Sequence, residues 1–438
     1  MTYHNAVKYI NTSPADREAP SLGAHVKQLW ALLNQPQKNM KYLRLAGSSG
    51  KTVCAEMLTS AYAHSHLSVG CLLMPLRSDF RDNIRINHAP LPFDELASYV
   101  DRIHRLIKEI NQGIAKRNRQ REVEAREPDD PVGSELPVCL TRHEILLTAA
   151  LLAFDAHHCK LCVIESDCTP SDPTKFLPPP LLLAICGTIP VLDRVETQQI
   201  RSYTCPGIQE MICAPQNQDD YRILSEICAK VNCRLTMPSR KEVELRSLSL
   251  TDSNFCYRGK QYRLKLCGKF QIENAVISLE ILNALNRLGF PLSYEAISEG
   301  LLDTRLPCKF EILSVSPTII ADSTHDPAAI ETVCDSLCEF HSLLGMKIHL
   351  CLPEGPLVNQ YIRALSERGY EIGSVITLSA ISVTEYIPPQ KNYFQVKLIQ
   401  ETVKKAIASL RSEEALLLSG PFAFTAKIRY EFLKQLGF

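Results

Sequence analysis

The sequence predicts an α/β fold in which helices cover mainly parallel sheets. From residue 40 onward, strand-like apolar runs alternate with helices of apolar periodicity, and this alternation is typical of parallel sheets. A second alternation of the same kind begins near residue 317. With 438 residues the chain is longer than one hydrophobic core usually serves, which favours two or three domains.

The first strand of the pattern, within residues 42–58 (YLRLAGSSGKTVCAEML), runs into a glycine-containing turn and then a helix. The turn consists of Gly47, Ser48, Ser49, Gly50, Lys51 and Thr52. Its glycines let backbone N–H groups face inward, where they and the helix N-terminus favour a polyanion. We expect Lys51 to reach the outer phosphates of a nucleotide and Thr52 to offer its hydroxyl to Mg²⁺.

This spacing, GxxGK[ST], is a short form of the phosphate-binding loop, and the strand before it and the helix after it support that interpretation. The first part of the chain is therefore predicted to be a P-loop parallel-sheet ATPase domain. The alternative is an ordinary Gly/Ser turn with a solvated lysine.

Further strands are predicted at residues 68–74, 160–166 and 181–187, and Glu165 lies at the carboxyl end of the second. Such strand ends are where α/β sheets bind ligands, although Glu165 could also be an ordinary carboxylate. Residues 111–135 are densely charged and predict a solvated helix end followed by a loop.

The later part of the chain predicts a helix at 220–231, a small antiparallel β excursion within 243–268, and a helix at 271–288. The second α/β alternation follows. We therefore predict an ATP-binding domain over residues 1–305 and a smaller, Rossmann-like α/β domain over 306–438.

The amino-acid composition argues against several classes of function. Forty-eight basic and 48 acidic side chains leave no net charge, which argues against a general binder of nucleic acid or anionic membranes. Seventeen irregularly spaced cysteines and no apolar signal peptide indicate a reduced, cytoplasmic protein. Cys159 and Cys162 have no second ligand pair, so we expect thiols of the core and not a zinc site.

Five segments, in order along nearly the whole chain, resemble folylpolyglutamate synthases and dihydrofolate synthases of the Mur ligase superfamily. These segments are the lead-in and loop at 25–52, MPLRSDFRDNIRIN at 74–87, LTRHEILLTAALLAF at 140–154 with the strand end LCVIES, GKFQIENAVISLEIL at 268–282, and PCKFEIL followed by ADSTHDPAAIETV at 307–333.

The resemblance implies an ATP-dependent ligase that forms an amide. In such enzymes ATP phosphorylates a substrate carboxylate, and an amine then attacks the acyl phosphate. The implied cofactors are ATP and Mg²⁺, and the implied partners are a small-molecule acid and an amino acid, with neither nucleic acid nor membrane, for a protein expected to be a monomer. Catalysis then depends on positioning and on electrostatic stabilisation of phosphoryl transfer.

The resemblance also implies roles for individual residues. The loop, with Lys51 as a catalytic residue, would hold the triphosphate, and Thr52 and Glu165 would bind Mg²⁺. Gln271 and Asn274, one helical turn apart, match nucleotide-contacting positions, although Asn274 could be a surface amide.

Three further residues are expected to take part in catalysis. Lys309 stands where the family has a phosphate-binding arginine. Asp322 and His325 match a conserved pattern of the family's C-terminal domain, and His325 could instead cap the helix near Pro327.

The sequence departs from the family pattern around the metal. The family's metal-binding serine is Met74 here, and a thioether is a poor Mg²⁺ ligand. The histidine that should follow is Leu76. The glycine-rich loop after Glu165 becomes SDCTPSDPTKF, the segment of the second metal site keeps only Asp193 as a candidate ligand, and the segment that carries a carbamylated lysine in relatives becomes QQIRSYTC.

Two explanations stay open: an active ligase with a rearranged metal site and a substrate other than folate, or a nucleotide-binding paralogue that no longer catalyses and acts as a sensor or interaction partner. A kinase or another simple P-loop NTPase is a third possibility, which would not require the separate C-terminal domain.

Overall fold

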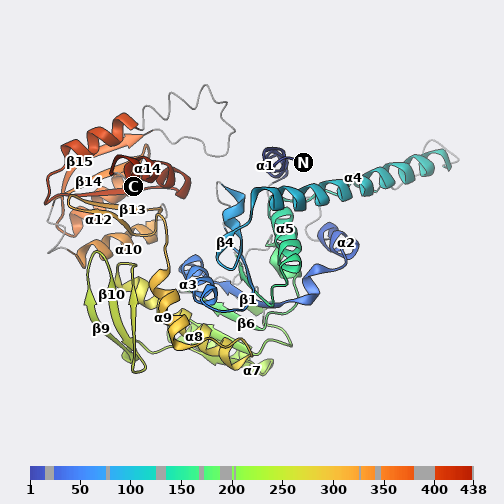
Figure 1. Cartoon of the computed structure of the whole chain (residues 1–438), viewed down its shortest axis with the longest axis horizontal. Helices are drawn as coiled ribbons and strands as arrows, with labels where there is room; N and C mark the ends of the chain where they lie inside the picture. Colours follow the sequence, from blue (N-terminus) through green and yellow to red (C-terminus); the bar gives the residue numbers. More distant parts are fainter. Residues whose placement is uncertain are drawn as a thin grey trace. The chain divides into compact units, whose positions relative to one another are not determined.

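The computed structural model describes residues 1–14, 24–74, 79–124, 135–166, 172–187, 200–201, 204–324, 327–340, 347–378 and 400–436. It divides into two compact units (Figure 1). The first contains Met1–Pro238 and Ile277–Gly300, and the second contains Ser239–Val276 and Leu301–Phe438. The sequence predicts one boundary at 305/306. That prediction assigns residues 239–276 to the first domain, whereas in the structure they belong to the second unit.

The predicted α/β class is confirmed, because each unit contains a mainly parallel sheet. In the first unit the strand order is β4-β3-β2-β5-β1-β6-β7-β8, and only β3 and β4 are antiparallel additions. The strands are β1 (Lys41–Ala46), β2 (Val69–Leu72), β3 (Ile84–Ile86), β4 (Ala89–Pro90), β5 (Leu161–Glu165), β6 (Leu182–Ile185), β7 (Glu210–Cys213) and β8 (Arg234–Thr236).

β1 lies in the middle of this sheet, between β5 and β6, and pairs parallel to both. Its register places Leu45 opposite Glu165 of β5. The carboxyl ends of three adjacent parallel strands therefore meet at one edge, which is the edge where α/β sheets bind ligands.

The helices of the first unit include one with a complete capping box. Thr141 accepts a hydrogen bond from the Glu144 N–H, and the Glu144 carboxylate accepts one from the Thr141 N–H, so both orphan donors at the start of α5 are satisfied. The helices are α1 (Tyr3–Thr12), α2 (Ala24–Leu32), α3 (Lys51–Ala63), α4 (Phe93–Glu124), α5 (Arg142–Ala156), α7 (Gln218–Lys230), most of α9 (Tyr294–Asp303) and the later part of α8 (Lys269–Arg287).

The second unit begins with the predicted β excursion, which is a three-stranded antiparallel sheet of order β11-β10-β9. A five-stranded sheet of order β12-β13-β16-β14-β15 follows, antiparallel only between β12 and β13. The strands are β9 (Val243–Leu248), β10 (Ser253–Tyr257), β11 (Lys260–Leu264), β12 (Glu311–Val315), β13 (Thr318–Asp322), β14 (Lys347–Pro353), β15 (Glu371–Leu378) and β16 (Ala415–Ser419).

Helices cover both faces of the five-stranded sheet. On β16, Leu416 and Leu418 belong to one buried apolar cluster while Ala415 and Leu417 belong to another. A strand buried on both faces needs an unbroken apolar run, which explains the sequence ALLLS. The helices of this unit are α10 (Pro327–Cys338), α12 (Leu357–Glu367), α14 (Phe422–Leu436) and the first part of α8.

The described residues also form short 3-10 helices, η2 (Pro36–Asn39), η3 (Phe80–Asn83), η4 (Pro173–Phe176) and η5 (Arg240–Glu242), and residues 400–409 are helical. Over the described ranges, no helix has the length and apolar character needed to cross a lipid bilayer.

Candidate functional site

The turn between β1 and α3 has the backbone that a phosphate-binding loop needs. Gly47 and Gly50 both have positive φ angles, 109° and 79°, which side chains rarely tolerate. A Cβ at Gly47 would also overlap the carbonyl oxygen of Cys186. α3 begins at Lys51, so the loop leads directly into the N-terminus of a 13-residue helix, whose partial positive charge favours an anion.

A second glycine turn, which the sequence analysis did not single out, packs against this loop. Gly187 follows β6 with a φ of 74°, and a Cβ there would lie 2.5 Å from Ser49 Oγ and 2.8 Å from Ser48 Oγ. Gly187 therefore belongs to the support of the loop. The sequence feature that could have identified this turn is a glycine directly after the apolar strand LLAIC.

The two predicted metal ligands lie together beside the loop. The Thr52 hydroxyl donates to the Glu165 carboxylate, at 2.9 Å from Oε1 and 3.1 Å from Oε2. Glu165 is only 2% exposed. A hydroxyl and a carboxylate are hard oxygen donors, and Mg²⁺ commonly uses one or two carboxylates together with phosphate oxygens and water. These two residues therefore fit a magnesium ion at a bound triphosphate.

Met74 contributes to this site through its backbone. Its N–H donates to Glu165 Oε2 at 3.1 Å, while its side chain is buried in the apolar cluster of the first unit. The thioether thus faces a core, where it cannot replace a serine ligand. In the described ranges no group of three or more His, Cys, Asp or Glu residues could hold a metal ion. A metal ion here would depend on phosphate oxygens and water for most of its coordination.

The strand end after Glu165 is held by a buried polar network. Ser166 Oγ donates to Asp172 Oδ2 at 2.6 Å and lies 2.6 Å from Thr174 Oγ1. Arg44 of β1 donates to the Thr174 carbonyl at 2.5 Å. All four residues are buried. This network connects the segment that replaces the family's glycine-rich loop to the strand that precedes the phosphate-binding loop.

In the second unit, Lys309 lies in a backbone segment of unusual conformation. Its neighbours Cys308 and Phe310 have φ angles of 58° and 52°, in the left-handed region that non-glycine residues avoid. Asp322, at the end of β13, stabilises this segment by accepting the Phe310 N–H at 2.8 Å. Such strain persists where the surroundings enforce it, and it occurs often at binding sites.

Asp322 accepts a second backbone hydrogen bond. Its second oxygen accepts the Thr324 N–H at 2.9 Å. Burial raises the pKa of the Asp322 carboxyl, whereas these hydrogen bonds and the positive charge of Lys309 oppose that rise. The predicted partner His325 lies outside the described residues.

Gln271 and Asn274 lie together at the start of α8, with Asn274 Nδ2 3.3 Å from Gln271 Oε1. Gln271 is 0% exposed, and its Nε2 finds no hydrogen-bond acceptor within the described part of the chain. A buried amide donor without an acceptor is costly unless a ligand completes it. The neighbouring Phe270 packs edge-on against Phe310, with ring centroids 6.1 Å apart, so the Gln271 and Lys309 segments lie close together.

The predicted site residues thus form two sets. Thr52 and Glu165 lie together beside the loop in the first unit. Gln271, Asn274, Lys309 and Asp322 lie in the second unit. That both sets act in one site stays a prediction.

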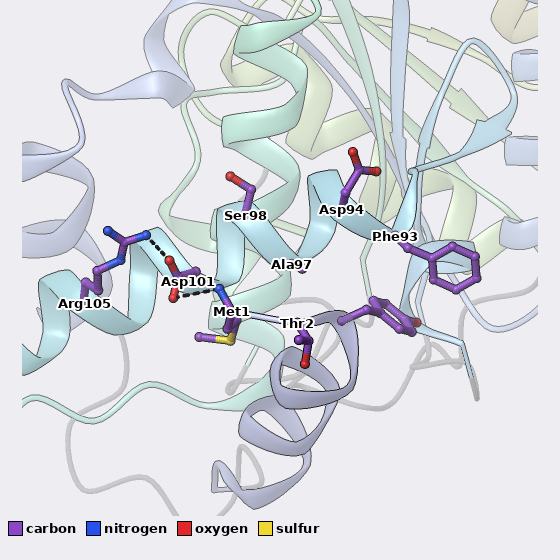
Figure 2. A pocket seen from close by; sticks show the side chains of 9 residues that line it. Met1, Thr2, Phe93, Asp94, Ala97, Ser98, Asp101 and Arg105 are labelled. Carbon is purple, nitrogen blue, oxygen red and sulfur yellow. Dashed lines mark hydrogen bonds and ion pairs between the residues drawn. The ribbon is translucent and has the colours of Figure 1, made fainter.

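A cavity of about 480 Å³ lies elsewhere in the first unit, between the chain start and α4 (Figure 2). Asp101 pairs there with Arg105 and with the amino group of Met1. None of the predicted site residues lines this cavity.

No protein-family model matches the chain. Curated proteins do. Folylpolyglutamate synthase of Lacticaseibacillus casei is 20% identical over 99% of both chains, and dihydrofolate synthase/folylpolyglutamate synthase of Bacillus subtilis is 21% identical over 76% of both. Along nearly its whole length the chain is thus similar to folylpolyglutamate synthases, at a low level of sequence identity.

A probable bifunctional folylpolyglutamate synthase/dihydropteroate synthase of Haloferax volcanii is 22% identical, and the chain spans 39% of its length. Solved structures of folylpolyglutamate synthases share the fold. The Lactobacillus casei enzyme aligns with a TM-score of 0.76 at 18% identity over 100% of both chains, and the Thermotoga maritima enzyme with 0.71 at 20% identity over 99% of this chain and 96% of that one. Other structures of folylpolyglutamate synthase are complexes with AMPPCP, with and without folate.

Proposed function

We propose that this chain is an ATP-dependent ligase that joins a small-molecule carboxylic acid to an amino acid through an acyl phosphate, with an altered metal site, and that it acts as a cytoplasmic monomer. The observation that carries the proposal is the contact between Thr52 and Glu165 beside the glycine turn. This arrangement offers backbone N–H groups, a lysine and two hard oxygen donors to one triphosphate.

The roles of the residues follow from their positions. The loop N–H groups and Lys51 would hold the outer phosphates and stabilise the charge that develops on the transferred phosphoryl group. Thr52 and Glu165 would hold Mg²⁺, which supplies Lewis-acid stabilisation of the phosphate oxygens when it is bound. Gln271 and Asn274 would contact the nucleotide, because Gln271 has a buried amide donor to offer. Lys309, Asp322 and His325 are proposed to complete the reacting site.

The direct test is formation of ADP. The full chain is incubated with ATP, Mg²⁺ and a panel of carboxylic acids and amino acids, and ADP release is measured beside amide formation. We expect release only when both an acid and an amine are present. Lys51→Ala should lower both nucleotide affinity and ADP release, and unchanged ATP binding in this variant would contradict the proposal.

A second candidate function is a nucleotide-binding paralogue without catalysis, acting as a sensor or as the partner of another protein. Met74 favours it, because the side chain in the position of the family's metal-binding serine is buried in the core. ATP binding that depends on Lys51, together with no ADP release for any substrate pair, would support this candidate over the ligase. A simple P-loop kinase is less well supported, because it does not require the second α/β unit.

A further inference from the structure

His349 faces an irregularity between β14 and β15, the last two strands at one edge of the five-stranded sheet. The register shifts by one residue between Ile348 and Leu350, so that His349 of β14 faces both Gly373 and Ser374 of β15. A bulge of this kind re-aims side chains on the longer strand. Here it brings a serine hydroxyl to an imidazole.

Three side chains then form a chain of contacts. Ser374 Oγ lies 2.7 Å from His349 Nδ1, and His349 Nε2 lies 3.2 Å from Glu414 Oε2. The serine is exposed, whereas the histidine and the glutamate are buried. A hydroxyl, an imidazole and a carboxylate in this spatial order are the components of the relay that activates a nucleophilic serine on many unrelated folds.

The backbone selects the tautomer that such a relay needs. The Ser374 N–H donates to His349 Nδ1 at 3.0 Å, so Nδ1 must carry a lone pair. The ring proton of the neutral imidazole is then on Nε2, where it is donated to Glu414. The Ser374 hydroxyl lies within reach of the same lone pair, which can accept the hydroxyl proton as a general base once the Ser374 N–H has released it.

Glu414 is held as a carboxylate. It accepts the Arg411 N–H at 3.0 Å and lies 3.2 Å from Lys347 Nζ. These contacts, the Arg411 hydrogen bond first, lower the pKa of Glu414 to about 2. The histidine ring is fixed from its other side as well, because a Cβ at Gly373 would lie 2.6 Å from His349 Cε1.

We propose that Ser374 is a nucleophile that accepts acyl groups from small activated esters, with His349 as its general base and Glu414 as the positioning residue. In this step Ser374 Oγ bonds to the ester carbonyl carbon, its proton passes to His349 Nδ1, and the alcohol leaves with that proton. Water then cleaves the acyl-serine by the reverse use of His349, giving the acid and restoring the hydroxyl. This activity needs no nucleotide and goes beyond the ligase function.

The class of substrate follows from the position. Ser374 is exposed on a strand that forms the edge of the sheet among the described strands, so a small ester can reach it from solvent. Edge strands also direct alternate N–H groups away from the sheet, and such donors can stabilise a developing oxyanion.

The test uses the full chain and a fluorophosphonate probe, which bonds its phosphorus to an activated serine and releases fluoride with the serine's proton. The modified residue is mapped by mass spectrometry. We expect Ser374 to react ~10²-fold faster than Ser412. Ser412 is the matched control, because it is an exposed serine whose hydroxyl contacts the Glu413 carboxylate, at 2.9 Å, instead of an imidazole.

Variants assign the roles. His349→Gln should lower the labelling rate of Ser374 ~10²-fold, and Ser412→Ala should leave it unchanged. If His349→Gln does not fold, the ratio of Ser374 labelling to Ser412 labelling in the wild type decides between the outcomes.

Two results would overturn the proposal: equal labelling of Ser374 and Ser412, or full labelling in a folded His349→Gln variant. Either of them would mean that the histidine only stabilises the bulge. The labelling is measured without nucleotide, so a failure of this proposal is distinguishable from a failure of the ligase proposal.

Discussion

At the scale of single residues, Thr52 connects the phosphate-binding loop to the carboxylate at the next strand end. Thr52→Val keeps the size of the side chain but removes the hydroxyl that Glu165 accepts. We expect a loss of at least about tenfold in Mg²⁺-dependent ATP affinity, since even outer contacts of metal sites commonly have effects of this size. Calorimetric titration with ATP in the presence and absence of Mg²⁺ measures it.

Thr52→Ser is the control for this prediction, because it retains the hydroxyl and should bind ATP and Mg²⁺ nearly as the wild type does. Equal affinities for Thr52→Val and Thr52→Ser would show that the hydroxyl does not contribute to the metal site.

Gly187 tests whether the second glycine turn supports the loop. In Gly187→Ala the new Cβ would displace Ser49 and strain a left-handed backbone, so ATP affinity should fall as well as stability. Gly259 has nearly the same φ, 75°, but a Cβ there meets nothing within 4 Å. Gly259→Ala should therefore cost only about 1 kcal/mol of stability, with unchanged ATP affinity.

Isothermal titration and chemical unfolding of both alanine variants measure the two effects. If Gly187→Ala binds ATP as tightly as Gly259→Ala does, the turn after β6 has no part in shaping the loop.

At the scale of secondary-structure elements, a buried ion pair joins α3 to β3. Arg85 Nη1 lies 2.6 Å from Glu56 Oε2, and the two side chains are 13% and 3% exposed. Arg85→Leu removes the guanidinium that offsets the buried Glu56 carboxylate, so it should destabilise the protein by about 3 kcal/mol. The midpoint of urea unfolding measures this loss.

A pair on the surface provides the comparison. Arg240 and Glu273 lie 3.1 Å apart, but their side chains are 74% and 55% exposed. Arg240→Leu should change the unfolding free energy by less than about 1 kcal/mol. Similar losses for both variants would show that burial does not determine the contribution of the α3–β3 pair.

Glu414 makes the stability of the second unit depend on pH. Because its pKa is lowered to about 2 in the folded state, its charge stabilises the fold above the ordinary glutamate range, and this contribution is lost as pH falls toward about 2. Glu414→Gln should therefore melt at a lower temperature than the wild type at about pH 7, and the difference should shrink at about pH 3. A difference that stays constant across this range would contradict the assigned contacts.

The sequence predicted elements best where the signal was local. The β1 strand, the glycine turn and α3 follow one another within residues 42–58, and the capping residues and apolar periods that define them are neighbours in the chain. The start of α8 was predicted within two residues, at 271 against Lys269. Propensity and periodicity are sufficient for such features.

Features that depend on distant segments were not predictable in the same way. Gly187 approaches Ser49 only after β6 pairs with β1. The backbone role of Met74 could not be read from its side chain, which had suggested only a lost ligand. The contact of His349 with Ser374 depends on a register shift between two parallel strands, and no local pattern encodes it.

At the scale of the whole molecule, nucleotide binding should be visible as stability. A ligand that binds only the folded state stabilises it by about 2.7 kcal/mol at a concentration 100 times its dissociation constant. We expect a non-hydrolysable ATP analogue with Mg²⁺ to raise the melting temperature of the wild type and not that of Lys51→Ala. A shift of equal size in both proteins would contradict binding at the glycine turn.

The chain passes between its two units three times, at 238/239, 276/277 and 300/301, and the middle passage lies inside the helix α8. Three crossings mean that no single cut can release either unit. A protease that nicks the chain between β8 and β9 would leave α8 intact, so residues 277–300 of the first unit would stay covalently joined to the second unit. An attempt to express the ATP-binding half by itself would have to cut this helix within two turns of Gln271.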